Sequence, residues 1–260
     1  MNDPGLDAIR SRTSYQEAFV GTPLITVCIA TYQRGQILCE RTLPTVLRQG
    51  YPNWEAVIVG DGCQDDTAAR IAALGDRRLR FYNRPSNGPY PEDPHRRWLV
   101  AGTYAANEAI ARARGRWIAP INDDDEWSDD HLAVLLAEAQ RTKAELVYGR
   151  MRVLIHGTGE ETWFGSWPPQ QGDFGLQAAI YHGDLRAFRF DITAHELGEP
   201  GDWNLVRRML EAGVRVAFVP LEVGTYHVAA NHSGQTWWSE RARRRGSLRL
   251  LAADAQGANS

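Results

Sequence analysis

Hydrophobic residues cluster along the chain in short runs rich in β-branched side chains, separated by longer stretches with helical spacing. Such runs are typical of buried strands. We expect strands at 24–30, 54–59, 79–82, 117–121, 145–155 and 214–219, and helices at 37–49, from 65 or 66 to 74, and at 99–114, 128–142 and 202–212. Strands that alternate with helices of ten or more residues form βαβ units. The pattern therefore predicts an α/β fold with a mostly parallel sheet between helices.

Other stretches interrupt this alternation. Residues 1–22 are polar and lack a period, so we interpret them as an arm or a poorly ordered lead-in. Residues 156–175 combine glycine, proline, tryptophan and glutamine, which predicts an irregular insertion before a strand, a turn and a short helix at 177–190. Pro44 lies inside the helix expected at 37–49, where it is expected to cause a kink.

Composition and charge exclude several classes of protein. The chain has 260 residues, and 29 basic against 32 acidic side chains give a formal charge of −3. A charge this close to zero argues against a protein that binds nucleic acid phosphates. No run approaches the roughly 20 apolar residues of a membrane-spanning helix, and Met1 to Arg12 lack the apolar core of a signal peptide. The three cysteines have neither metal-ligand spacing nor an even count, so a reducing cytoplasm is the expected location.

Carboxylates follow two of the predicted strands directly. Asp61 comes after the second strand, and the run 123–125 comes after the fourth. Parallel sheets bind ligands at the carboxyl ends of their strands. Consecutive carboxylates repel one another, and a divalent cation with oxygen ligands, Mg²⁺ or Mn²⁺, is their natural partner. The alternative interpretation is a solvated acidic turn before the helix at 128; the position directly after an apolar strand favours a site.

No glycine-rich phosphate loop follows the first strand. Both the Gly-x-x-x-x-Gly-Lys-Ser/Thr pattern and the Gly-x-Gly-x-x-Gly pattern are absent. Their absence excludes the usual ATPases and dinucleotide-binding enzymes. The phosphates of a ligand bound at this sheet edge must therefore be held mainly through a metal.

Four segments in the correct order carry a resemblance to a known family. They are Val27–Arg34, Tyr51–Thr67, Ala113–Trp127, and Gly201–Leu205 followed by Arg207 or Arg208. The chain resembles an inverting glycosyltransferase of family 2, and the match spans roughly residues 23 to 235. The resemblance implies the GT-A fold, which is a Rossmann-like, mostly parallel sheet flanked by helices in a single domain.

The resemblance also implies roles for residues in the nucleotide-sugar half. Ala30, Thr31 and Tyr32 would lie along the base and ribose, in a turn that includes Arg34. Asp61 would hydrogen-bond the base or the ribose. Two further residues complete this set, namely Asp123 as a contact of ribose or metal and Arg97, or its neighbour Arg96, as a source of positive charge.

The remaining implied roles concern the metal and the reaction. Asp124 and Asp125 would be the ligands of a Mn²⁺ or Mg²⁺ that bridges the diphosphate, with His227 or His232 as a third ligand. Asp202 would be the general base that takes the proton of the acceptor hydroxyl. The alternatives are an ordinary helix cap at Asp202, and Glu199 as the base in its place.

The sequence departs from the family pattern at several positions. Gly60 and Asn122 stand where the family often has aspartate, and Cys63 where it often has serine. The segment 105–107 lacks the arginine that the family has before its metal motif. Because of these departures, the sequence does not determine which residues bind the metal. A non-catalytic, nucleotide-binding module remains an alternative.

We thus expect one GT-A domain at 23–240, with a nucleotide-sugar half at 23–127 and an acceptor half at 128–240, an arm at 1–22 and an arginine-rich tail at 241–260. The expected activity is metal-dependent, inverting transfer of a sugar from a UDP-sugar to an acceptor hydroxyl of a saccharide or other small molecule. A sugar-phosphate nucleotidyltransferase is a further alternative, although the glycine-rich signature of that class is absent after the first strand. The arginine-rich tail is a candidate for weak contact with a membrane or a protein.

Overall fold

The computed structural model describes residues 4–229 and 235–245. Its strands are β1 (Ile25–Thr31), β2 (Trp54–Gly60), β3 (Leu79–Asn83), β4 (Trp117–Pro120), β5 (Glu126–Trp127), β6 (Leu146–Ile155), β7 (Glu161–Phe164), β8 (Ala179–His182) and β9 (Val216–Val228). Its α-helices are α1 (Pro4–Arg10), α2 (Thr13–Glu17), α3 (Gly35–Ile37), α4 (Leu43–Leu47), α5 (Thr67–Ala73), α6 (Pro94–Val100), α7 (Thr103–Arg112), α8 (His131–Thr142), α9 (Gly201–Glu211) and α10 (Gln235–Arg245).

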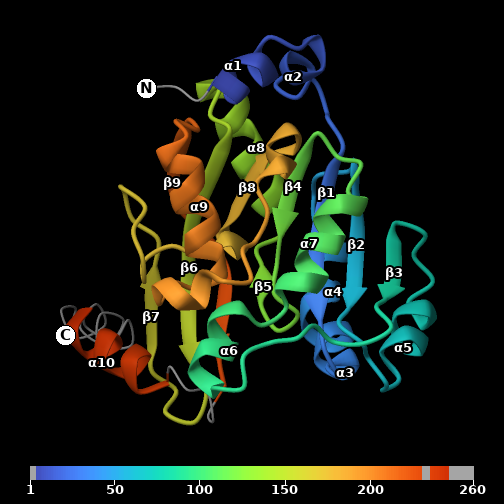
Figure 1. The fold of residues 1–260 in the computed structure, drawn as a ribbon, viewed down its shortest axis with the longest axis vertical. Coiled ribbons are helices and arrows are strands. Elements are labelled where there is room, and N and C mark those ends of the chain that lie inside the picture. Colours follow the sequence, from blue (N-terminus) through green and yellow to red (C-terminus); the bar gives the residue numbers. More distant parts are fainter. Residues whose placement is uncertain (1–3, 230–234, 246–260) are drawn as a thin grey trace, which may run out of the picture.

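The strands form one mixed sheet in the order β3-β2-β1-β4-β8-β6-β9-β5, and β7 pairs with β6. The strands β3, β2, β1 and β4 are mutually parallel, as are β6 and β9, whereas β8 runs antiparallel to both of its neighbours. Figure 1 shows the carboxyl ends of the parallel strands at the lower edge of the molecule. The predicted α/β fold with a mostly parallel sheet between helices is confirmed.

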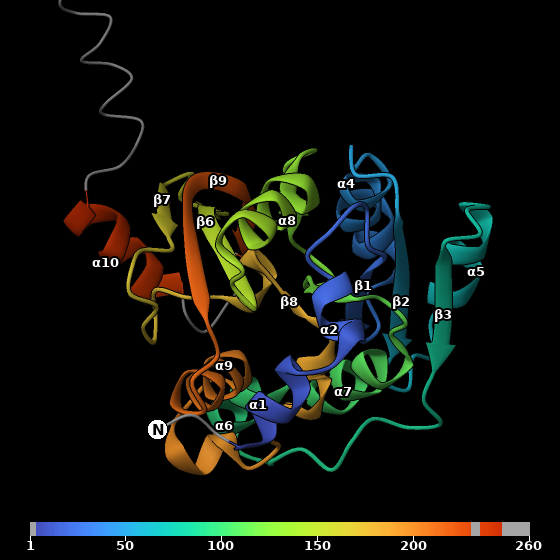
Figure 2. The ribbon, with the colours of Figure 1, turned by 90° about the horizontal axis from the view of Figure 1, so that it is seen from above.

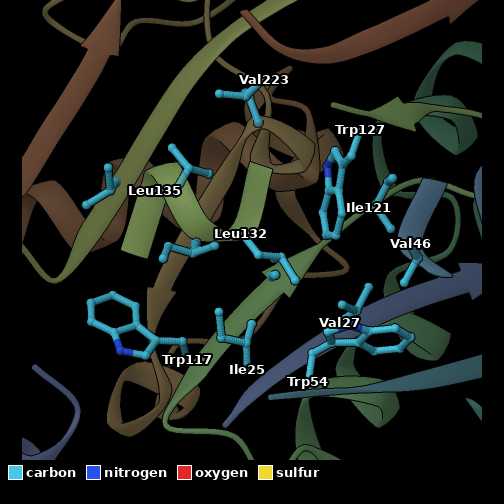
Figure 3. Packing of buried hydrophobic residues seen from close by; sticks show 14 of the residues in the cluster. Ile25, Val27, Val46, Trp54, Trp117, Ile121, Trp127, Leu132, Leu135 and Val223 are labelled. Atoms are coloured by element: carbon cyan, nitrogen blue, oxygen red, sulfur yellow. The ribbon is translucent and has the colours of Figure 1, made fainter. Parts of the chain in front are cut away.

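Successive side chains of the strands point to opposite faces of the sheet and pack in two hydrophobic layers. In β1, Ile25, Val27 and Ile29 belong to one buried cluster, and Cys28 belongs to the other. The first cluster lies under α4 and α8, and the second under α7 and α9, so helices cover both faces (Figure 2). Figure 3 shows Leu132 and Leu135 of α8 packed over the first layer. Burial on both faces explains the continuous apolar runs of these strands.

Two expected helices are divided in the structure, each at the residue that breaks the pattern. The helix expected at 37–49 consists of α3, a π-helical turn at Leu38–Thr42 and α4, which starts at Leu43. Pro44 lacks the N–H that an α-helix needs at this point, so the backbone widens just before it. The helix expected at 99–114 starts earlier, as α6, and breaks at Gly102, whose φ of 77° lies in the left-handed region.

Residues 4–17, which the sequence predicts to lie in an arm without regular structure, form α1 and α2. Tyr15 and Phe19 are buried against the sheet. The anchor is polar and distant in sequence: Glu145 is fully buried, and its carboxylate accepts hydrogen bonds from Arg10 at 2.7 Å and from the Tyr15 hydroxyl at 2.5 Å. The backbone N–H of Arg215 donates to the same carboxylate at 2.8 Å. Because this anchor lies about 130 residues away, no local period reveals it.

The acceptor half contains more strand than the sequence predicts. The segment expected to be irregular, 156–175, includes β7, and β9 continues to Val228 instead of ending near 219. The expected arginine-rich tail begins inside α10, where Trp238 packs on Phe164 and Tyr226. Residues 246–260 lie outside the described part of the chain. None of the helices formed by the described residues is long and apolar enough to cross a membrane.

Candidate functional site

The carboxyl ends of β1, β2 and β4 bring the predicted acidic segments together. The backbone N–H of Asp61 donates to the Thr31 carbonyl at 2.8 Å. On the other side of β1, the Thr31 hydroxyl donates to Asp123 Oδ2 at 2.7 Å. Thr31 therefore links two segments that lie 62 residues apart in the sequence, from position 61 to position 123. The two acidic segments thus lie together at one edge of the sheet.

Asp61 lies in a buried corner with two partners that the sequence analysis does not include. Arg84 forms an ion pair with Asp61, and the Tyr90 hydroxyl donates to its Oδ2 at 2.6 Å. Burial, together with the hydrogen bond to Asp61, raises the pKa of Tyr90 above its ordinary value. Arg84 directly follows β3, whose end lies at the same edge as that of β2. Its position immediately after a strand is the signal that could have found it.

The departure at Gly60 has a structural counterpart. A Cβ at this position would lie 2.5 Å from the Asn83 side-chain oxygen and 3.1 Å from Cys63 Sγ. Asn83 uses the space, since its amide accepts from the Cys63 N–H at 2.9 Å and donates to the Cys63 carbonyl at 2.7 Å. An aspartate at position 60 would not fit this packing. The turn after β2 is thus held by the Asn83 amide.

Asp123 is a buried carboxylate with a raised pKa. Burial and the negative charge of Asp124 raise the pKa of Asp123 to about 6, although Arg34 and the Thr31 hydroxyl act in the opposite direction. Arg34 Nη1 lies 3.3 Å from Asp123 Oδ1 and 2.5 Å from Asp124 Oδ2. The charges of both carboxylates raise the pKa of Arg34 despite its partial burial, so this arginine stays protonated.

Asp124 and Asp125 have different environments. The Asp124 side chain is 23% exposed, whereas Asp125 is completely buried. The backbone N–H of His227 donates to Asp125 Oδ1 at 3.1 Å, and the Asn122 amide donates to Oδ2 at 2.8 Å. Burial and the nearby charge of Asp124 raise the pKa of Asp125 well above its ordinary value. Asn122, the second departure from the family pattern, thus supplies a donor that an aspartate would lack.

Of the two histidines predicted as metal ligands, the structure describes only His227. Both ring nitrogens of His227 contact side chains of the protein, Nε2 at 2.7 Å from Glu126 and Nδ1 at 2.9 Å from His156 Nε2. Burial lowers the pKa of His227. His232 lies outside the described residues. Within residues 4–229 and 235–245, no three histidine, cysteine, aspartate or glutamate side chains gather as a metal centre. Of the predicted ligands, Asp124 has the accessible carboxylate and could bind Mg²⁺ or Mn²⁺, which take only one or two protein carboxylates.

The other predicted nucleotide contacts differ in their position and in their exposure to solvent. Tyr32 directly follows β1 and is 49% exposed, and Ala30 is partly buried on the α7 face of the sheet. Arg97 lies in α6, is exposed, and donates to the Pro91 carbonyl at 2.9 Å. The cations that contact the site carboxylates are Arg34 and Arg84.

Asp202 lies in the first turn of α9 and does not cap it. The residue at the cap position is Pro200. Asp202 Oδ1 accepts the N–H of its neighbour Trp203 at 2.7 Å. Burial raises the pKa of Asp202, and the N–H groups of Trp203 and Leu176 offset part of that rise. Burial raises the pKa of Tyr226 above its ordinary value, and the charges of Asp125, Asp124 and Asp202 add to this rise.

Glu199, the alternative base, is held by its neighbours. Its carboxylate accepts from Arg207 at 2.7 and 3.0 Å and from the Asn204 amide at 2.7 Å. The hydrogen bond from Arg207 is the main reason that the pKa of Glu199 is lowered. A carboxylate in such an ion pair is a poor proton acceptor. The contrast with Asp202 favours Asp202 as the base.

Replacing Asp123 by asparagine is expected to stabilise the free protein at neutral pH. Because the pKa of about 6 in the folded protein exceeds the ordinary 3.8, the folded state loses stability as the pH rises between these values. A difference of about two units corresponds to at most about 3 kcal/mol. We expect thermal denaturation to show a melting temperature several degrees above wild type at pH 7.5 and little difference below pH 4. Asp129→Asn, in the turn between β5 and α8 and exposed, is the control. An equal effect of Asp123→Asn at both pH values would contradict this expectation.

The sequence matches the family model described as glycosyl transferase family 2 over residues 26–91 and 95–196. The chain belongs to glycosyl transferase family 2. Among curated family 2 relatives, the putative colanic acid biosynthesis glycosyl transferase WcaA of Escherichia coli K12 is 36% identical over 123 residues, which are 46% of this chain and 39% of WcaA. The chain thus matches less than two thirds of the length of this relative.

Solved structures support the fold of this family 2 chain. A crystal structure of S. aureus TarS 1-349 in complex with UDP has a TM-score of 0.60 at 16% identity, and the match covers 78% of this chain and 60% of that fragment. The mannosyltransferase PcManGT from Pyrobaculum calidifontis, in complex with GDP-Man and Mn²⁺, has a TM-score of 0.58 at 18% identity and covers 95% of this chain and 71% of that protein. Both are glycosyltransferase structures, and the expected GT-A fold is confirmed.

Proposed function

We propose that this protein is a metal-dependent, inverting glycosyltransferase that moves a sugar from a nucleotide-sugar to an acceptor hydroxyl. The observation that carries the proposal is the gathering of Asp61, Asp123 and Asp124 at one sheet edge, while Asp202, in the first turn of α9, has no ion-pair partner among the described residues. This combination offers a nucleotide site, a cation site and a base in one molecule.

The nucleotide is assigned to the Asp61 side of the edge. The Asp61 carboxylate accepts hydrogen bonds, so it suits an N–H of the base or a ribose hydroxyl, and Arg84 and Tyr90 line the same corner. Thr31 and the exposed ring of Tyr32 continue this surface toward Asp123, which suits a ribose hydroxyl. UDP is the proposed nucleotide because the similar TarS structure contains UDP. GDP is the alternative, since PcManGT contains GDP-Man.

Asp124 is the proposed metal ligand, with Asp123 beside it. A divalent cation bound there would stabilise the negative charge that develops on the departing nucleoside diphosphate. The buried and hydrogen-bonded Asp125 is assigned to holding the end of β9 through the His227 N–H. His227 is in turn assigned to the contacts with Glu126 and His156 rather than to the metal.

Asp202 is the proposed general base. The acceptor hydroxyl is a weak nucleophile at neutral pH and needs a carboxylate to take its proton. In one displacement, the acceptor oxygen bonds to the anomeric carbon while the bond from that carbon to the diphosphate breaks. The proton moves to Asp202, and the configuration at the anomeric carbon inverts. The raised pKa of Asp202 suits this role, because it makes the carboxylate a stronger base than an exposed aspartate.

Calorimetric titration with UDP and GDP, each with and without Mn²⁺, tests the nucleotide assignment. We expect UDP to bind with Mn²⁺ and to lose at least about tenfold in affinity either without the metal or in Asp61→Asn. Asp66→Asn is the matched control, because Asp66 is exposed and pairs with Arg70 on α5. Equal affinity of Asp61→Asn and wild type would contradict the assignment, and preference for GDP would replace UDP with the alternative.

A further inference from the structure

Arg34 connects the two carboxylates of the proposed cation site. Its Nη1 lies 2.5 Å from Asp124 Oδ2 and 3.3 Å from Asp123 Oδ1. A guanidinium has five N–H donors in a planar fork, and here one nitrogen makes both contacts. Within the described residues, the other side-chain N–H groups of Arg34 donate to no protein acceptor. Most of the hydrogen-bonding capacity of this arginine is therefore available to another partner.

The surroundings of Arg34 leave room for the guanidinium to move. The side chain is 49% exposed. It lines a groove of about 710 Å³ that continues along α3 and α5. Gln33, Gly35, Arg41 and Arg70 are among the other residues that line this groove. A half-exposed side chain beside an open groove can change rotamer without disturbing the core.

Arg34 and a divalent cation compete for the same oxygen atoms. Two adjacent carboxylates repel each other unless a cation lies between them, and Arg34 is that cation in the free protein. A Mg²⁺ ion requires its ligand oxygens at about 2.0–2.1 Å. The guanidinium nitrogen 2.5 Å from Asp124 Oδ2 uses one lone pair of that oxygen, and its positive charge repels a divalent cation placed beside it. Binding of a metal to this carboxylate is therefore favoured by movement of the arginine away from it.

We propose that Arg34 is an internal counter-cation, which neutralises Asp123 and Asp124 in the free protein and moves to the donor diphosphate when a metal binds Asp124. The proposal rests on the function proposed above. Diphosphate oxygens accept hydrogen bonds from a guanidinium fork. The diphosphate of the nucleotide-sugar therefore replaces the hydrogen bonds that Arg34 loses when it moves away from the two carboxylates. Metal binding and nucleotide binding then favour each other, and by thermodynamic linkage the effect is reciprocal.

Titration of Mn²⁺ alone, followed by the electron paramagnetic resonance signal of the free ion, tests the competition. We expect Arg34→Gln to bind Mn²⁺ about tenfold more tightly than wild type, because the competing cation is gone. Arg41→Gln is the matched control, since Arg41 donates at 3.1 Å to the backbone carbonyl of Asp124 and not to its carboxylate. We expect its Mn²⁺ affinity to remain within about twofold of wild type. Asp124→Asn should abolish the binding in either background.

A second titration of Mn²⁺ in the presence of saturating UDP measures the coupling. We expect UDP to increase the Mn²⁺ affinity of wild type by a larger factor than that of Arg34→Gln. Equal Mn²⁺ affinity of wild type and Arg34→Gln, or an equal increase in Arg41→Gln, would overturn the inference. If Asp124→Asn still removes Mn²⁺ binding in that case, the proposed function stands without it. Absence of Mn²⁺ binding in every variant, each with a wild-type melting temperature, would overturn both.

Discussion

Asp202→Asn is expected to fold normally and bind the donor nucleotide, yet to transfer sugar at least about a hundredfold more slowly than wild type. Positioned general bases contribute on the order of 10²–10⁴ in rate, and asparagine has the size of aspartate without its basicity. The fold should tolerate the change, because Asp202 makes no ion pair in the described residues and the asparagine side-chain oxygen can still accept the Trp203 N–H. Release of nucleoside diphosphate and product formation, measured at saturating donor, give the rate.

Glu199→Gln provides the contrasting control for this prediction. Glu199 is bound by Arg207 and Asn204, so its replacement should lower the melting temperature and leave the chemical step within a few-fold of wild type. Near-wild-type turnover in Asp202→Asn, combined with a large loss in Glu199→Gln, would transfer the role of base to Glu199.

The pH dependence of wild type provides a further measure of Asp202. A base must be deprotonated to act, so kcat/KM should fall as the pH is lowered through the pKa of Asp202. Because burial raises that pKa, the fall should occur above the pH range in which an ordinary aspartate titrates. An acid limb centred at or below the ordinary aspartate pKa of 3.8, in a protein that remains folded, would argue against Asp202 as the base.

Glu145→Ala is expected to destabilise the folded protein by about 3–5 kcal/mol, since breaking a buried ion pair leaves an uncompensated charge. The variant would leave Arg10, the Tyr15 hydroxyl and the N–H of Arg215 without their shared acceptor. Burial by itself would raise the pKa of Glu145, but the hydrogen bonds from Arg10, Arg215 and Tyr15 lower it below the ordinary value. Chemical denaturation at pH 7.5 measures the loss.

Two comparisons sharpen this second prediction. Glu138→Ala removes a carboxylate from the surface pair with Arg141, which is 72% exposed, and should cost less than about 1 kcal/mol. Because the pKa of Glu145 is lowered in the folded state, its contribution is present above the ordinary pKa and lost as the pH falls through the lowered value. A loss below about 1 kcal/mol in Glu145→Ala would show that α1 and α2 do not depend on this anchor.

The sequence reveals the parallel half of the fold because β1, β2 and β4 are buried on both faces and each crossover helix lies between two strands in the chain. For example, one apolar run predicts the strand β4, and the acidic residues directly after it predict the position of the site. β7 is less visible because it has only four residues, and the second part of β9 because three exposed residues, 220–222, interrupt the strand after Val219. The anchoring of Tyr15 by Glu145 depends on residues 130 positions apart, which no periodicity detects.

The candidate site shows the same limits at the level of single residues. Asp61, Asp123 and Asp124 directly follow strands, and their positions alone make them candidates, whereas Asp202 is a candidate through the family resemblance. The difference between Asp124 and Asp125 could not be predicted, because neighbouring aspartates look alike until burial separates them. The ion pair of Arg84 with Asp61 likewise depends on the pairing of β3 with β2, which only the fold determines.

The most direct test of the account is the release of nucleoside diphosphate from a panel of nucleotide-sugars, measured with and without Mn²⁺. We expect wild type to release the diphosphate from donors of one nucleotide, UDP in the first instance, by transfer or by slow hydrolysis, and only with the divalent metal. Binding of the nucleotide without release from any donor, in the presence of either Mn²⁺ or Mg²⁺, would contradict an enzymatic role and identify the protein as a non-catalytic, nucleotide-binding member of its family.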